Sequence, residues 1–355
     1  MTTDSPRILI VKLGAVGDCV HTLYAARALR LHFPESHIAW AVEEKSFEVV
    51  NGHPDLSQVF RIERKSGISR WIDSARAVSE TPYDITVDFS NLLKSGLVTK
   101  FSSSKKRIGF SRLREANFLF TNQRIVSRQG HMVQRYFRLL EPLGITMPDD
   151  AFENGRIPDH LKTSVFVPEE KKRGVDQFLH ETSHDKAPIV LVNPHGTWPN
   201  KLYPIQHYAT VCMRLIEEGA RIVVAWGGPA EKQHAQRLVE MIGHRVHLAP
   251  PTDLKELAHL LSRSTMYLGN DTGPMHIAAA AGTAVVAVFG PTSPSRVGPL
   301  AEHVRVVTPQ GICDKWPCEK KKCGRPYCIN EIAPAKVIDA ALSLMNELRE
   351  ANQGQ

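Results

Sequence analysis

The sequence has no long hydrophobic run. Its first apolar stretch, 8–13, is too short for the core of a signal peptide, and no stretch reaches the roughly 18 apolar residues that a membrane span needs. We therefore expect a cytoplasmic protein whose six cysteines stay mainly reduced. Hydrophobic residues still make up 42% of the chain and charged residues 23%, which is typical of a folded protein and excludes a largely disordered one.

Stacking aromatic residues are scarce. Phe, Trp and Tyr make up 7% of the chain, and they are not interleaved with the basic residues as a single-stranded nucleic-acid-binding surface requires. We therefore expect no nucleic-acid partner. The net charge of +7 nevertheless favours acidic partners such as phosphates, anionic sugars or an anionic membrane face. Nine basic residues lie within 94–128 with Glu115 as the single acid, so this segment is either a binding surface or an ordinary solvated face.

A complete dinucleotide fingerprint is also missing. The first glycine loop reads GAVGD at 14–18, whereas nicotinamide-binding folds need G-x-G-x-x-G between strand and helix. Glu43 nevertheless stands about where such folds place a ribose-binding acid. A nucleotide-dependent oxidoreductase therefore stays open as an alternative, which an absorbance titration with nicotinamide cofactors would exclude.

Strand and helix patterns alternate along both halves of the chain. β-Branched runs such as 7–13 and 85–89 are separated by helical patterns, and the same alternation fills 189–289. This is typical of parallel sheets with crossover helices, and 355 residues are enough for two such domains. We predict an α/β protein of two facing Rossmann-like domains, with a boundary within 158–188 and a last helix at 334–350.

The loop at 14–18 joins a buried-looking strand to a helix. Gly14 and Gly17 allow the backbone to approach a ligand closely, and the N-terminus of a helix follows. Asp18 stands at the expected cap position. Its carboxylate therefore either caps the helix or faces the ligand, where it could take a proton as a general base.

The sequence GNDTGPMHIAAAAG again indicates a strand, a tight turn and a helix of small residues. Asp271, Thr272 and Gly273 precede a proline at the expected first helical turn, which leaves backbone N–H groups open to an anion. His276 lies in the same turn and faces either a ligand or the core. A lone histidine is more often a structural residue than a ligand contact.

Two further loops follow expected strands of the second half. The loop 193–204 offers the hydroxyl of Thr197 and the charge of Lys201, which suit a diphosphate but also occur in plain connectors. The loop 226–238 carries Glu231 early in a helix. That acid either favours the helix N-terminus or accepts hydrogen bonds from a ribose.

Four of the six cysteines lie within sixteen residues. A structural zinc site is one interpretation, but the compact C-x2-C pairs that zinc sites usually have are missing, and we expect no metal. Nearby lysines would lower the thiol pKa values and make the loop prone to oxidation. The four residues are Cys313, Cys318, Cys323 and Cys328.

Three segments together resemble one family. They are KLGAVGDCVHTLYAARALR, then DFSNLLKSGLVTK with RLREANFLF, and DTGPMHIAAAAGTAVVAVFGPTSPSRVG. The chain resembles the ADP-heptose:lipopolysaccharide heptosyltransferases of glycosyltransferase family 9, and its middle segment is most similar to heptosyltransferase I. The resemblance implies the GT-B architecture, with an acceptor-binding domain at 1–165, a linker at 166–187, a nucleotide-sugar-binding domain at 188–332 and a C-terminal helix at 333–355.

The resemblance also implies a role for each motif residue. Asp18 corresponds to the catalytic base, and Lys201 to a catalytic lysine that contacts phosphate. The acceptor-binding residues that it implies are Lys94, Arg114 and His131. The donor-binding residues that it implies are Gly14, Gly17, Thr197, Glu231, Asp271, Thr272, Gly273 and His276.

The activity implied is transfer of heptose from ADP-L-glycero-D-manno-heptose to the Kdo or inner-core acceptor of lipopolysaccharide. The transfer would invert the anomeric centre and need neither metal nor cofactor. Because the acceptor carries lipid, we expect the protein to bind peripherally at the anionic inner face of the inner membrane. The alternatives are a non-catalytic nucleotide-sugar or lipopolysaccharide-binding protein, and a related transferase with another sugar acceptor.

Overall fold

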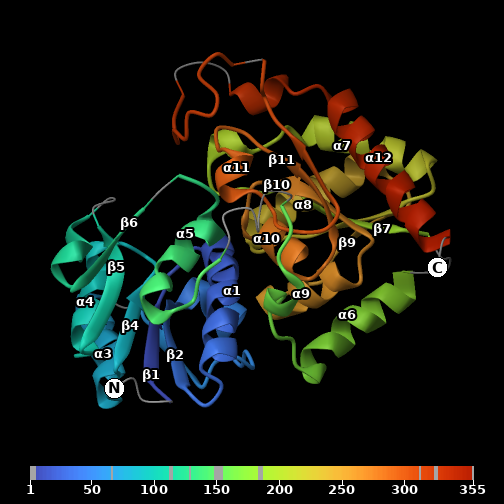
Figure 1. Ribbon diagram of the computed structural model, residues 1–355. Coiled ribbons are helices and arrows are strands. Elements are labelled where there is room, and N and C mark those ends of the chain that lie inside the picture. Colours follow the sequence, from blue (N-terminus) through green and yellow to red (C-terminus); the bar gives the residue numbers. More distant parts are fainter. Residues whose placement is uncertain are drawn as a thin grey trace. The chain divides into compact units, whose positions relative to one another are not determined.

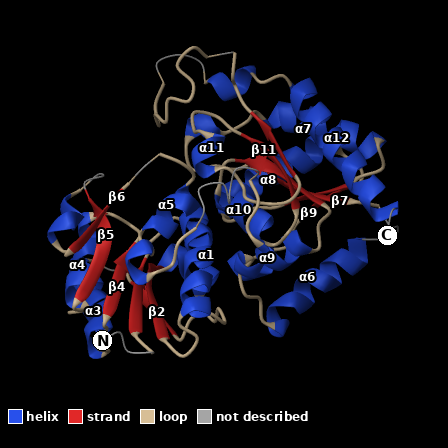
Figure 2. Cartoon of the chain, in the orientation of Figure 1, coloured by secondary structure: helices blue, strands red, loops and turns tan. Residues whose placement is uncertain are grey.

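The computed structural model contains two α/β units (Figures 1 and 2). It describes residues 5–64, 67–111, 115–127, 129–147, 155–182, 187–311, 313–323 and 327–353. The first unit is Met1–Phe166 and the second is Val167–Gln355. Arg114, which the resemblance assigns to the acceptor, lies outside the described residues.

A parallel sheet of six strands forms the centre of the first unit, in the order β3-β2-β1-β4-β5-β6. The order reverses between β1 and β4, and in open parallel sheets ligands bind outside the carboxyl ends of the strands at such a reversal. The strands are β1 (Arg7–Val11), β2 (His37–Glu43), β3 (Gln58–Ile62), β4 (Ile85–Asp88), β5 (Lys106–Ser111) and β6 (Gln123–Val126).

Helices and short 3-10 segments connect these strands. The helix after β1 is the longest, and its buried residues pack on the sheet. The helices are α1 (Val16–His32), α2 (Phe47–Val50), α3 (Ile68–Arg76), α4 (Leu93–Phe101) and α5 (Met132–Arg138). The 3-10 segments are η1 (Glu44–Ser46), η2 (Ala77–Glu80), η3 (Ala116–Leu119), η4 (Glu141–Leu143) and η6 (Asp159–Leu161).

The second unit repeats this topology, with the strand order β12-β11-β10-β7-β8-β9 and a reversal between β7 and β10. Its strands are β7 (Ile189–Asn193), β8 (Arg221–Val224), β9 (Val246–Leu248), β10 (Met266–Asn270), β11 (Ala284–Val288) and β12 (Val304–Val307). Its helical segments are α6 (Glu169–Thr182), η7 (Pro199–Lys201), α7 (Ile205–Glu217), α8 (Pro229–Ile242), α9 (Leu254–Ser262), α10 (Gly273–Ala280), α11 (Pro294–Val297), η8 (Cys328–Glu331) and α12 (Pro334–Gln353).

Burial on both faces explains the composition of the central strands. Every residue of β10 and β11 is buried, as expected for a parallel sheet covered by helices on both sides. Figure 2 shows helices flanking the strands within each unit. The predicted α/β class is therefore confirmed, and none of the described helices is long and apolar enough to cross a membrane.

The last helix, α12, completes the core of the second unit. Val337, Ala341 and Leu344 are fully buried, and their spacing places them on one face of the helix. That face packs on α7 and on strands β11 and β12. The C-terminal helix is thus part of this hydrophobic core.

Replacing Leu344 by alanine is expected to lower the free energy of unfolding by about 2–5 kcal/mol, because the cavity left in a packed core adds to the lost transfer energy. Denaturant unfolding of the full chain measures this. Asn346→Ala, at an exposed position of the same helix, should change stability by less than about 0.5 kcal/mol. Equal effects of the two substitutions would contradict the packing described.

Candidate functional site

The first polar cluster lies where the sheet of the first unit reverses its order. The chain leaves β1 at Lys12 and leaves β4 at Phe89, and the Phe89 N–H donates to the Val11 carbonyl at 3.0 Å. The two strand ends are therefore side by side. This is the position at which a Rossmann-like sheet binds its ligand.

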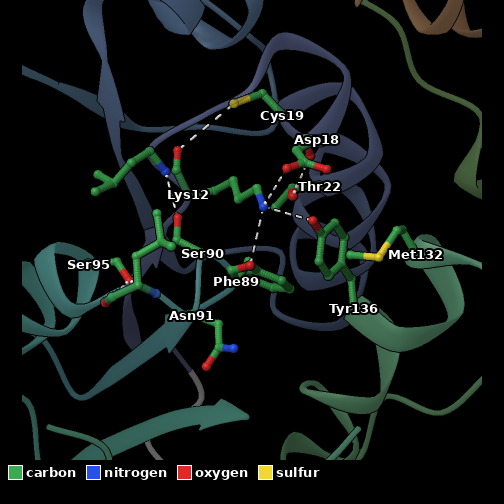
Figure 3. A network of polar contacts seen from close by, with 12 residues as sticks. Lys12, Asp18, Cys19, Thr22, Phe89, Ser90, Asn91, Ser95, Met132 and Tyr136 are labelled. Carbon is green, nitrogen blue, oxygen red and sulfur yellow. Dashed lines mark hydrogen bonds and ion pairs between the residues drawn. The ribbon is translucent and has the colours of Figure 1, made fainter. Parts of the chain in front are cut away.

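Lys12 is the centre of this cluster (Figure 3). Its ammonium lies 3.1 Å from an Asp18 carboxylate oxygen and donates to the Tyr136 hydroxyl at 2.8 Å and to the Phe89 carbonyl at 3.3 Å. The side chain is only 5% exposed. The buried Lys12 ammonium is thus held by groups from α1, from α5 and from the loop after β4.

Electrostatics keep this cation charged. Burial lowers the pKa of Lys12, but the Asp18 carboxylate and Tyr136 outweigh burial, so that the net pKa is raised above its ordinary value. Burial also raises the pKa of Tyr136, and it raises the pKa of the adjacent Cys19 thiol to about 12. At neutral pH the cluster therefore holds an ammonium, a neutral phenol and a neutral thiol.

Asp18 does not cap its helix, so that interpretation was wrong. Helix α1 begins at Val16, its N-cap is Ala15, and no side chain makes a capping hydrogen bond there. Asp18 instead lies in the first turn, with its side chain 38% exposed and held by Lys12. The carboxylate is therefore both positioned and accessible, as a proton acceptor must be.

A second buried acid shapes the loop beside the cluster. Asp88, at the end of β4, accepts hydrogen bonds from the Ser95 hydroxyl, the Asn117 amide and the backbone N–H groups of Ser90 and Asn91. Burial raises its pKa, and these hydrogen bonds oppose that shift. Because the Ser90 hydroxyl also accepts the Leu13 N–H, directly before the glycine loop, Asp88 and Ser90 connect the segments that follow β4 and β1.

The expected acceptor residues lie in different surroundings. Lys94 forms an ion pair with Glu43, so the charge of Lys94 is compensated. The Glu43 carboxylate also lies 3.4 Å from the Arg64 guanidinium. His131 caps α5, accepts the Val133 N–H at 3.3 Å and places its ring 5.2 Å from that of His21 on α1. The structure therefore places His131 against the helix that carries Asp18 and pairs Lys94 with the acid at the end of β2.

The second polar cluster lies at the reversal in the sheet of the second unit. Lys201, in η7, forms an ion pair with Asp271, which follows β10. The Thr292 hydroxyl donates to the same carboxylate at 2.5 Å, and the Lys201 ammonium lies 4.7 Å from the Trp198 ring centroid. Both charged side chains are largely buried, at 12% and 5% exposure. Two expected site residues thus hold each other in place.

Helix α10 starts directly after Asp271. Its N-cap is Thr272, its first residue is Gly273, and no side chain caps its first turn. The Thr272 methyl lies 3.7 Å from the position that a Cβ atom on Gly196 would occupy. The loop 193–204 therefore passes close to the start of α10. His276 is buried in the helix. The turn therefore offers backbone N–H groups beside the Lys201–Asp271 pair, as anion binding requires.

Glu231 and Thr197 complete the expected donor residues of this unit. Glu231 lies in the first turn of α8, and its carboxylate accepts the Gly227 N–H at 2.8 Å, which closes its own loop. Thr197 is exposed. The other two expected donor residues, Gly14 and Gly17, lie in the first unit, in the loop beneath Asp18 and at the start of α1.

His195, which the sequence did not single out, lies buried in the loop after β7. Its ring donates to the Ala225 carbonyl and lies 5.4 Å from the ring of His234. The residue is only 6% exposed. The pKa of His195 is lowered to about 4, mainly by burial and to a smaller extent by the charge of His234. The imidazole is therefore neutral at physiological pH.

This shift predicts a pH dependence of stability. The unfolded chain binds a proton on His195 below about pH 6.5, whereas the folded chain binds it only near pH 4, so stability is lost as the pH falls through this window. The loss reaches about 3 kcal/mol. Unfolding of His195→Gln should depend less on pH between 6.5 and 4, while exposed His244→Gln keeps the parent's dependence. Identical profiles would contradict the shift.

Comparison with known sequences identifies the family. Residues 71–326 match the family model described as glycosyltransferase family 9 (heptosyltransferase). The chain belongs to glycosyltransferase family 9. This family 9 chain is 28% identical over 319 residues to lipopolysaccharide heptosyltransferase 1 of Escherichia coli O18:K1:H7, covering 86% of this chain and 92% of that protein.

Two solved structures share the fold of this family 9 member. A glycosyltransferase family 9 protein of Veillonella parvula has a TM-score of 0.81 at 24% identity, covering 98% of this chain and 99% of that one. The E. coli heptosyltransferase WaaC, solved with ADP, has a TM-score of 0.74 at 23% identity, covering 95% and 99%. The predicted GT-B fold is therefore confirmed.

Membership of family 9 makes the chain a glycosyltransferase and excludes the oxidoreductase alternative. Glu43, which that alternative assigned to a ribose, is instead buried and engaged by Lys94 and Arg64. In this family 9 member the acid at the end of β2 therefore pairs with two basic residues of the first unit.

Sequence reasoning missed two residues of the first cluster. Lys12 carried a signal, because a lysine inside the run RILIVKLG sits where lysines are rarely buried without a partner. Tyr136 carried none, since it lies 124 residues from Lys12 along the chain. Only the fold brings it to the cluster.

The four clustered cysteines, Cys313, Cys318, Cys323 and Cys328, are free thiols. The pKa of Cys328 is raised, mainly by burial. The neighbouring cysteines 313, 318 and 323 raise it further. The expectation of lowered thiol pKa values is thus wrong for Cys328. Within the described part of the chain, no group of three or more His, Cys, Asp or Glu residues is placed to hold a metal ion.

Proposed function

We propose that this chain transfers heptose from ADP-heptose to the Kdo-bearing inner core of lipopolysaccharide. The family supports glycosyl transfer, and the relative named lipopolysaccharide heptosyltransferase 1 supports the sugar and the acceptor. The ADP in the WaaC structure supports the nucleotide. The observation that carries the chemistry is the accessible Asp18 carboxylate fixed by the buried Lys12 ammonium.

In the first unit, Asp18 acts as the general base. The acceptor hydroxyl gives its proton to the Asp18 carboxylate while its oxygen forms a bond to the anomeric carbon. The bond from that carbon to the phosphate oxygen breaks in the same step, and its electron pair leaves with ADP. This single displacement inverts the anomeric centre.

In the second unit, Lys201 and the first turn of α10 stabilise the departing ADP. Negative charge grows on the diphosphate as the bond breaks, and a preorganised cation and backbone N–H groups lower the energy of that state. Asp271 holds Lys201 in position and Thr292 holds Asp271. Fixed protein groups thus supply this stabilisation, and we propose that no metal is needed.

The acceptor binds the first unit through basic residues. His131 lies against α1, the helix that carries Asp18, while Lys94 lies on α4 in its pair with Glu43 and Arg114 belongs to the same basic segment. The basic segment also attracts the protein to an anionic membrane surface, where the lipid-bearing acceptor resides. We therefore propose peripheral binding at the inner face of the inner membrane.

Incubation of the purified protein with ADP-heptose and Kdo-bearing lipid A, with and without chelator, tests this proposal. We expect ADP release in both samples and a product of inverted anomeric configuration by NMR. Loss of activity with chelator would contradict metal independence. Retention of configuration would contradict the single displacement, and binding without turnover would favour a non-catalytic role or another acceptor.

A further inference from the structure

The lysine-rich loop 313–323 contacts the loop 193–204 of the second unit, which carries Thr197 and Lys201. In Figure 1 this orange segment lies beside α11, to which Glu319 is tied by an ion pair with Arg296 at 2.8 Å. Three hydrogen bonds fix it further, and they run from Trp316 Nε1 to the Gly290 carbonyl (2.8 Å), from the Glu319 N–H to the Pro291 carbonyl (2.9 Å) and from Asn200 Nδ2 to the Lys320 carbonyl (2.6 Å).

These contacts bring a second ammonium to the Trp198 ring. Lys321 follows directly after the residue bound by Asn200, and its ammonium lies 5.2 Å from the Trp198 ring centroid. The Lys201 ammonium lies 4.7 Å from the same centroid. One indole therefore positions two lysines by cation–π attraction, although they lie 120 residues apart in the sequence.

The two lysines differ in the charge that they can offer. Lys201 is largely buried and its charge is balanced by Asp271. Lys321 is exposed, and none of the described residues forms an ion pair with it. A nucleoside diphosphate carries more than one negative charge, and a lysine contacts phosphate as a point charge. An exposed cation beside the balanced Lys201 can therefore compensate further charge on the diphosphate, and Lys321 lies at the same indole ring.

We propose that Lys321 binds the diphosphate of the donor nucleotide together with Lys201, and that the contacts of the loop 313–323 place it there. This inference rests on the proposed use of a nucleoside diphosphate sugar. It assigns to the loop a binding role that does not depend on a metal. The residue acts as a donor-binding residue, and Trp198 and Asn200 position it.

Calorimetric titration of the full chain with ADP, AMP and adenosine tests the proposal. Lys321→Gln should raise the dissociation constant for ADP by about 5- to 20-fold, have a smaller effect on AMP, and leave adenosine unchanged, because only the phosphate contact is lost. It should also reduce the salt dependence of ADP binding. Lys321→Arg, which keeps the charge, should restore most of the affinity.

Lys322→Gln is the matched control, since it removes the same charge from the next residue of the loop. It should change ADP affinity by less than about 2-fold, as expected for a screened surface charge. Equal effects of Lys321→Gln and Lys322→Gln would overturn the proposal. A parent that binds UDP or GDP but not ADP would contradict the ADP-heptose donor, and the same comparison would then be made with that nucleotide. A parent that binds no nucleoside diphosphate would contradict both.

Discussion

Asp18→Asn is expected to lower kcat by about 10²- to 10⁴-fold, the contribution that a general base usually makes. The amide keeps the shape of the carboxylate and can still accept from Lys12, which lies 3.1 Å away, but it cannot take a proton at neutral pH. The dissociation constant for ADP-heptose should change by less than about 3-fold, because the substitution removes a group that acts on the acceptor hydroxyl. Single-turnover assays and calorimetry separate the two effects.

Asp73→Asn provides a matched control for this substitution. Asp73 is an exposed acid on α3 of the same unit, so the charge change is equal and no buried partner is lost. Its kcat should equal that of the parent. Full activity of Asp18→Asn would contradict the assignment of the base, and equal losses in both variants would indicate that net charge, rather than the Lys12–Asp18 pair, controls turnover.

Lys201→Met is expected to cost about 3–5 kcal/mol of unfolding free energy, because it leaves the Asp271 carboxylate buried with Thr292 as its remaining side-chain partner. The methionine fills a similar volume, so the loss reports on charge rather than packing. Adding Asp271→Asn to Lys201→Met should recover much of this stability, since the unpaired charge is then gone. ADP affinity should stay low in both variants.

Lys171→Met tests the same chemistry in an exposed setting. Lys171 lies 2.6 Å from Asp253 in an ion pair whose side chains are 38% and 31% exposed. Because water screens such pairs, the substitution should cost less than about 1 kcal/mol. If Lys201→Met cost no more than this, the Lys201–Asp271 pair would not be the buried pair that the structure describes.

The sequence predicted those parts of the fold that local patterns encode. Alternating β-branched runs indicated the parallel sheets, and the predicted helix at 334–350 is α12. Strands β5 and β6 were not predicted, because their apolar stretches at Ile108 and Ile125 are short and lie among the basic residues of 94–128. The sequence left a cap role open for Asp18, which would start the helix at 19, three residues later than Val16, where α1 begins.

The candidate sites were predicted as separate loops but not as networks. The sequence placed Lys201 and Asp271 after different strands, and the shared carboxyl edge of the sheet explains why they meet. It could not show that Lys94 pairs with Glu43 or that Tyr136 contacts Lys12, because such pairings depend on how distant elements pack. His195 had no distinguishing pattern, and its low pKa follows from its burial and from the nearby charge of His234, which only the fold brings about.

The mass of the acceptor after incubation with ADP-heptose tests the central claim most directly. We predict that Kdo-bearing lipid A gains one heptose for each ADP released by the parent, and that Asp18→Asn forms both products about 10²- to 10⁴-fold more slowly. An acceptor of unchanged mass, with ADP-heptose bound tightly and left intact, would contradict heptose transfer by this chain.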